Sequence, residues 1–240
     1  MYAAKKPRRK PQKRRNIPMG EASEVVIPIF GILDVTGEVI TMWALLAVLA
    51  VFSLLVTRNL KERPGKLQNM VELGIERLES FFSGILGRES GRKYYFFLSS
   101  MFIFILFANY SGLIPGMGLT KYFKAPTSSL SVTLGLGICA FLFLQIAGLC
   151  AGAKKYFKRF VSPMAFMLPL LLLDEIIKPA SLALRLFGNV FGEETVTEKL
   201  YEILPVGAPM IMMALSLLFC AIQAVVFTML VSIYLSETLE

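Results

Sequence analysis

Histidine is absent from this 240-residue sequence, which also contains only three cysteines and one tryptophan. Without histidine, haem ligation, imidazole ligation of zinc and a histidine proton relay are excluded. Cys139, Cys150 and Cys220 all lie in apolar runs, and no CxxC spacing occurs. The cysteines are therefore expected to be free thiols that behave as small hydrophobic side chains, and the sequence predicts no metal site and no cofactor.

Charged residues are also scarce, at 18% of the chain, where soluble domains have about 25%. Hydrophobic residues make up 55%, and four runs of 19, 27, 29 and 34 residues contain no charge. These runs cover residues 39–57, 94–120, 125–153 and 203–236. Because a membrane-spanning helix needs about 20 mostly apolar residues, the sequence predicts an all-α polytopic membrane protein.

The formal net charge of +8 is a property of the N-terminal region. Eight Lys and Arg residues lie within residues 5–15, and the other 17 basic residues equal the 17 acidic residues in number. A block of like charge interrupted by prolines is typical of disorder. We therefore expect a basic disordered tail at 1–20 and a single membrane domain at 21–240. The tail is expected to bind lipid headgroups, or no partner, rather than nucleic acid.

Within this domain we expect about five membrane helices. Three spans are predicted at about 39–57, 94–114 and 128–151, followed by a segment rich in charge at 162–195 and a last helix at about 203–237. The last apolar run exceeds one bilayer thickness by about a dozen residues. The last two helices are therefore expected to be long and tilted.

One further helix is predicted to be amphipathic, at about 66–86. Apolar residues recur there at steps of three and four, from Leu67 to Ile85, and glutamates lie mainly between them. This pattern favours a helix that lies along the membrane interface. A helix packed on the protein surface is the alternative.

Five spans would place the two termini on opposite faces of the membrane. The loops at 58–93 and 153–162 carry 12 Lys and Arg, whereas the other face has three without the tail and 11 with it. The tail lies more than 20 residues from the first span, so we leave it out of the count. The cytoplasmic preference of basic loops then predicts an N-terminus outside and a C-terminus in the cytoplasm.

The segment at 162–195 carries most of the candidate functional residues. Insertion scales put the cost of an Arg, Lys or Asp at the centre of a membrane helix at about 2.5–3.5 kcal/mol, and such residues usually mark ion pathways. At about 100° per residue, two of these charges fall within about 20° of Arg185 and thus form a polar stripe. The charged residues are Asp174, Glu175, Lys178, Arg185, Glu193 and Glu194.

Arg185 differs from the other charges in this segment. Asp174 and Lys178 are one turn apart and are expected to pair, whereas Arg185 has no acidic residue three or four positions away. A guanidinium stays protonated, so it suits a gate or the counter-ion of a carboxylate. The alternative roles are a bundle-fixing ion pair for Arg185 and snorkelling for Lys178, Glu193 and Glu194. Glu194 points to roughly the opposite side of the helix from Arg185 and so to a different polar cavity.

Three uncharged polar residues join this set of candidates. Asn189 lies about 40° from Arg185 around the helix and extends the polar stripe. Ser216 and Gln223 lie in the last apolar run. A contact between helices and the lining of a pathway are both open for these residues.

Two stretches of the chain resemble a known family, the a subunits of F-type ATP synthases. KPASLALRLFGNVFGEE at 178–194 resembles the signature helix of that family, and CAIQAVVFTMLVSIYLSETLE at 220–240 resembles its last helix. The likeness extends over about 30–240. It implies translocation of protons or sodium through two half-channels against a rotating ring of c subunits. The chain itself has no GxxxxGK[ST] motif for nucleotides, so it is expected to be a non-catalytic subunit.

The resemblance also assigns roles to the candidate residues at the centre of the charged helix. Arg185 matches the arginine that faces the ring carboxylate and separates the two half-channels. Asn189 and Gln223 match its polar neighbours.

Other candidates match the two half-channels of the family. Glu194 matches the acidic residue of the outer half-channel. Ser216 stands where many bacterial members have histidine, which leaves outer protonation to Glu193, Glu194 and water. The residues that resemble the inner half-channel are Asp174, Glu175 and Lys178.

The implied partners are the c-ring, the peripheral-stalk b subunits, the F1 sector through the assembled complex, and membrane lipid. The implied location is a bacterial inner membrane. A stand-alone secondary transporter or channel is the main alternative, although we find no internal repeats of the kind that such folds often have. A structural membrane anchor is a second alternative, which gives no reason for Arg185.

Overall fold

The computed structural model describes residues 25–29, 33–58, 65–113, 125–161, 168–203 and 207–239. The tail predicted at 1–20 lies outside these residues. Helices dominate the part that is described, and the prediction of an all-α polytopic membrane protein is confirmed. The elements are β1 (Val25–Ile29), β2 (Leu33–Thr36), α1 (Gly37–Thr57), α2 (Lys66–Leu86), α3 (Arg88–Ser111), a short 3-10 helix η2 (Pro126–Ser128), α4 (Leu130–Val161), α5 (Leu168–Ile203) and α6 (Ala208–Leu239).

Strands β1 and β2 form a small antiparallel sheet immediately before α1. Val25 pairs with Thr36 and Ile29 pairs with Leu33. No strand was predicted here from the sequence. Val, Ile and Thr favour strands, so the local composition agrees with the pairing in hindsight.

Four of the described helices are long and apolar enough to cross a membrane. They are α1, α3, the part of α4 that ends at Gly152, and α6 from Met210 onward. Gly152 has a φ of 147°, which side-chain-bearing residues rarely adopt, and it interrupts the regular helix of α4. Charged residues spread along α5 keep it outside this group, so its assignment as a fifth membrane helix stays a prediction.

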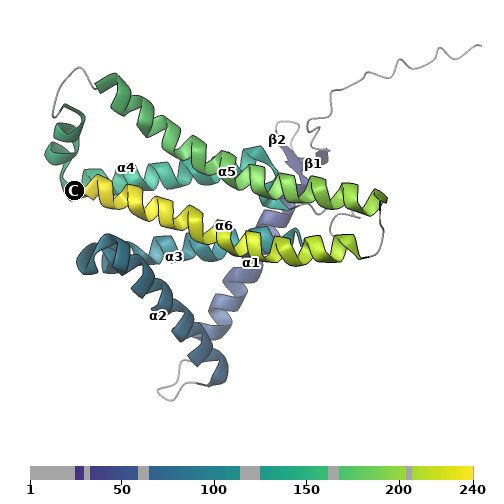
Figure 1. Cartoon of the computed structure of the whole chain (residues 1–240). Coiled ribbons are helices and arrows are strands. Elements are labelled where there is room, and N and C mark those ends of the chain that lie inside the picture. Colours follow the sequence, from purple (N-terminus) through teal and green to yellow (C-terminus); the bar gives the residue numbers. More distant parts are fainter. Residues whose placement is uncertain are drawn as a thin grey trace, which may run out of the picture.

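Helix α2 begins and ends at the predicted residues. Phe82 near its C-terminal end is fully buried, whereas Leu67 and Met70 at the other end are 76% and 74% exposed. Its C-terminal part packs on the bundle, and its N-terminal part extends away from it (Figure 1). The amphipathic helix is therefore present, and its location at a membrane interface stays a prediction.

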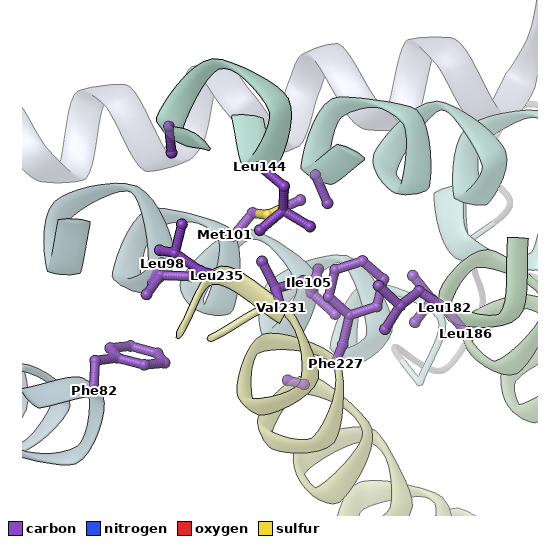
Figure 2. Packing of buried hydrophobic residues seen from close by; sticks show 13 residues of the cluster. Phe82, Leu98, Met101, Ile105, Leu144, Leu182, Leu186, Phe227, Val231 and Leu235 are labelled. Atoms are coloured by element: carbon purple, nitrogen blue, oxygen red, sulfur yellow. The ribbon is translucent and has the colours of Figure 1, made fainter. Parts of the chain in front are cut away.

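Helices α3, α4, α5 and α6 pack together into the bundle that carries the candidate site (Figure 1). Large apolar side chains fill its interior, where Phe227 and Val231 of α6 lie among residues of α3, α4 and α5 (Figure 2). Since lipid is as apolar as these side chains, close packing and polar contacts hold membrane helices together. The labelled core residues of the bundle are Leu98, Met101, Ile105, Leu144, Leu182, Leu186, Phe227, Val231 and Leu235.

Helices α5 and α6 have 36 and 32 residues. At 1.5 Å per residue they are about 54 and 48 Å long, well beyond a hydrocarbon core of about 30 Å. The predicted length is confirmed, while the tilt stays a prediction. α5 continues eight residues past the predicted end at 195, and α6 begins at Ala208 because Gly207 before it has a φ of +100°.

Candidate functional site

Three residues of α5 make polar side-chain contacts with α6. The partner on α6 moves toward the N-terminus as the residue on α5 moves toward the C-terminus, so the two helices are antiparallel. The first and last contacts lie 15 residues apart on α5, or about 22 Å along its axis. The contacts are Lys178 with Glu237, Asn189 with Gln223, and Glu193 with Cys220.

Arg185 lies between the first two of these contacts. Its side chain is exposed, and it makes no hydrogen bond or ion pair with any residue that the structure describes. The neighbouring Leu182 and Leu186 are buried and direct α5 toward the core. The guanidinium therefore stands at the outer side of the helix pair, and no bundle-fixing ion pair holds it within the described ranges.

Asn189 and Gln223 form a short bond beside Arg185. Nδ2 of Asn189 donates to Oε1 of Gln223 at 2.6 Å. Gln223 is only 4% exposed, and its own Nε2 has no hydrogen-bond partner among the described residues. A buried amide donor without a partner is costly in apolar surroundings. Near the arginine, Gln223 thus still has an amide N–H group that can donate a hydrogen bond.

Lys178 makes a different contact from the one that the sequence predicts. Its Nζ lies 2.8 Å from Oε2 of Glu237 and 5.1 Å from the centre of the Tyr234 ring. The predicted pair with Asp174 is wrong, because α6 offers both a carboxylate and an aromatic face. Asp174 is exposed and makes no hydrogen bond or ion pair with a residue in the described ranges.

Glu175 contacts α4 rather than α6. Nε2 of Gln145 donates to Oε1 of Glu175 at 2.8 Å, and both residues are half-buried. Sequence analysis missed Gln145. The available signal was that it is the one amide side chain in the uncharged run at 125–153.

The other end of α5 has a second polar cluster around Glu193. The Cys220 thiol and the Ser216 hydroxyl both donate to the Glu193 carboxylate, with the thiol sulfur 3.7 Å from Oε2. Nδ2 of Asn109 donates to the backbone oxygen of Cys220 at 3.5 Å. Asn109 is 1% exposed, and its Oδ1 has no partner among the described residues. Asn109 of α3 is thus a further candidate that the sequence did not single out.

Glu194 lies beside α3, whereas Glu193 faces α6. A Cβ atom placed on Gly112 would come 3.8 Å from Oε1 of Glu194. Gly112 follows the last residue of α3. The two consecutive glutamates therefore have different neighbours, and only Glu193 contacts Ser216.

Comparison with known proteins identifies the family. Residues 39–236 match the family model described as ATP synthase A chain. The chain belongs to this family. Its relatives include ATP synthase subunit a 1 of Syntrophotalea carbinolica, which is 38% identical over 202 residues that cover 82% of this chain and 83% of the relative. ATP synthase subunit a of Moorella thermoacetica is 36% identical over 208 residues, which cover 86% and 92% of the two chains.

Membership of the ATP synthase A chain family gives the apolar helices a context. Together they make the chain a multi-pass membrane protein that takes part in ATP synthesis and ion transport. The matched range contains all nine residues that the sequence analysis selected, and it ends one residue before Glu237. The candidate site thus lies within the part that this chain shares with its family.

In this family member the charges follow an order along α5. Glu175 and Arg185 are ten residues apart, or about 15 Å along the axis, and Arg185 and Glu193 are about 12 Å apart. A fixed positive charge therefore stands between two acidic groups.

Proposed function

We propose that this chain passes ions, protons or sodium, between the two sides of a membrane through two half-channels that meet a rotating ring of c subunits. Arg185 separates the two half-channels. The chain is the stationary part of this rotary motor, and it binds no nucleotide itself. The energy comes from the membrane potential, about 2.3 kcal/mol per charge per 100 mV, together with the ion gradient.

The observation that carries this proposal is the state of Arg185. The residue is exposed at the outer side of the bundle and is unpaired among the described residues. An intramembrane cation without a partner among the described residues needs a carboxylate from elsewhere. A carboxylate on a passing c subunit meets that need, and the exposed Ile177 and Leu184 beside Arg185 provide an apolar contact surface for such a ring.

The two acidic ends of α5 serve the two half-channels. On the outer side an ion passes Glu194 and Glu193, with Ser216 next to Glu193, and neutralises a ring carboxylate. The ring turns that neutral carboxylate through lipid. On the inner side the carboxylate releases its ion near Asp174, Glu175 and Lys178.

Arg185 keeps the two half-channels separate during this cycle. Its charge favours the ionised ring carboxylate, so the ion leaves before the carboxylate passes the arginine. The same charge repels a cation that would otherwise cross directly from one half-channel to the other. Asn189 and Gln223 keep the surroundings of the arginine polar through their 2.6 Å bond.

Family membership supports the proposed partners and location, and the distribution of basic loops supports the proposed orientation. The chain contacts the c-ring through α5 and α6, and the peripheral-stalk b subunits and the F1 sector complete the complex. It resides in a bacterial inner membrane, with its N-terminus outside and its C-terminus in the cytoplasm.

The test is Arg185→Ala in the complete complex, reconstituted in vesicles. We expect gradient-driven ATP synthesis to fall below about a tenth of the wild-type rate, together with a passive ion leak. Arg77→Ala is a matched control, because Arg77 is an exposed arginine on α2, away from the site. Arg77→Ala should keep the wild-type rate. Coupled synthesis and pumping without a leak in Arg185→Ala would refute the separating role.

A further inference from the structure

The contact between Gln145 and Glu175 places an oriented carboxylate between α4 and α5. The bond is 2.8 Å long, and it joins two half-buried side chains on different helices. The α4–α5 pair is close elsewhere too, because a Cβ atom on Gly137 would lie 2.8 Å from the backbone oxygen of Pro179. Glu175 is therefore held against a tightly packed neighbouring helix.

Gln145 differs from the partner that holds the other charge at this end of α5. The charge of Lys178 is compensated by Glu237. The amide of Gln145 has no charge, so it orients the Glu175 carboxylate and leaves its negative charge uncompensated by this contact. A carboxylate that is oriented and still charged is able to take up and release a cation.

The neighbouring acidic residue is not held in this way. Asp174 is exposed and makes no hydrogen bond or ion pair with a described residue. Consecutive residues on a helix point about 100° apart, so Asp174 and Glu175 face different surroundings. Of these two carboxylates, Glu175 is therefore the one that a neighbouring helix holds in a defined position.

We infer that Gln145 of α4 is a positioning residue, which holds the Glu175 carboxylate between α4 and α5 as the place of ion transfer on the inner side. This inference rests on the proposed function and adds a residue and a path to it. The inner ion route then follows the contact between α4 and α5. At the same end of α5, Lys178 instead contacts Glu237 of α6.

The experiment compares variants of the complete complex in vesicles. Gln145→Leu should lower both ATP synthesis and ATP-driven pumping several-fold, because the carboxylate loses its donor. Glu175→Gln should lower them at least as much, and the double variant Gln145→Leu/Glu175→Gln should be no worse than Glu175→Gln alone. Gln68→Leu is the matched control, because Gln68 donates to Glu72 in α2 with the same 2.8 Å geometry.

A swapped pair separates positioning from simple adhesion between helices. Gln145→Glu combined with Glu175→Gln keeps one amide and one carboxylate between α4 and α5. We expect it to restore at least half of the rate that Glu175→Gln loses. Failure of the swap in a complex that assembles normally, or additive losses in the double variant, would overturn the positioning role.

The outcomes also separate this inference from the proposed function. If Arg185→Ala uncouples the complex while Gln145→Leu behaves as the wild type does, only the positioning role fails. If Arg185→Ala remains coupled, the separating role fails, whatever the Gln145 variants do.

Discussion

Helices α5 and α6 are neighbours of similar length with opposite ways of holding polar residues. α6 carries buried hydroxyl groups that bond to its own backbone, as when Thr228 donates to the oxygen of Ala224 at 2.9 Å and Ser232 to that of Thr228 at 2.8 Å. Such bonds satisfy a polar side chain within its own helix. α5 instead carries charges from Asp174 to Glu202, and three of them contact side chains of other helices, namely Glu175, Lys178 and Glu193.

The two helices differ most in the charges of α5. Glu175, Lys178 and Glu193 each have a polar neighbour on another helix, whereas Asp174 and Arg185 are exposed without a described partner. α6 supplies neutral partners such as Gln223 and Ser216, and its apolar side chains fill the core (Figure 2). α6 is thus the more apolar helix of the pair, and α5 carries the charges on which the proposed function rests.

The largest effect on stability is expected at Gly137, where α4 packs closely against α5. Gly137→Leu would bring a side chain to 2.8 Å from the Pro179 oxygen and 3.2 Å from Cβ of Ala183. Such overpacking costs about 1–3 kcal/mol. Unfolding of the detergent-solubilised protein by SDS should show the loss.

Gly135 provides a matched control for this substitution. It lies two residues away on α4, and a Cβ atom there meets nothing within 4 Å. Gly135→Leu should therefore leave the SDS midpoint close to the wild type. Equal shifts for the two variants would show that α5 does not depend on close packing against α4.

Sequence patterns predicted the helices of this bundle better than their partners. The uncharged runs located α1, α3, α4 and α6, and three- and four-residue spacing gave α2 with its bounds, since each signal is local. The predicted bounds of α1 are right to within two residues, whereas α3 begins six residues earlier and α4 ends ten residues later than predicted. α5 ends later than predicted, at Ile203. The segment past 195 remains helical there, and Lys199 and Glu202 pair within it at 3.0 Å.

The contacts between helices were beyond such reasoning. Helical spacing placed Asp174 near Lys178, but it carried no information on Glu237 or Tyr234, which come from α6. The same limit hid Gln145. The rotation of one helix against another is decided by packing over the whole bundle, and a single amide in an apolar run does not reveal its partner.

A smaller effect on stability is expected for the bond between Asn189 and Gln223 in the middle of the helix pair. A double-mutant cycle of Asn189→Leu and Gln223→Leu measures the 2.6 Å bond that joins α5 to α6. Hydrogen bonds between membrane helices contribute about 0.6 kcal/mol on average and about 1.7 at most. We expect a coupling energy in that range from SDS unfolding.

Thr228 provides the control for this cycle. Its hydroxyl bonds to the backbone of its own helix, so Thr228→Val and Asn189→Leu should be additive within about 0.5 kcal/mol. A coupling of Asn189 to Thr228 as large as that to Gln223 would mean that the cycle reports general loosening of the helix pair.

The smallest effect on stability is expected for the ion pair between Lys178 and Glu237. Glu237 has a half-exposed side chain, at 51%, and ion pairs of this kind contribute about 0–1 kcal/mol. Lys178→Met should therefore lower the SDS midpoint only slightly, and high salt should reduce the difference from the wild type. The informative measurement is a pair of double-mutant cycles, which shows whether Lys178→Met is energetically coupled to Glu237→Gln or to Asp174→Asn. Lys178→Met and Glu237→Gln should be non-additive, because they remove the same contact, whereas Lys178→Met and Asp174→Asn should add. The reverse result would mean that Lys178 pairs with Asp174 within α5, and that no ion pair of Lys178 joins α5 to α6.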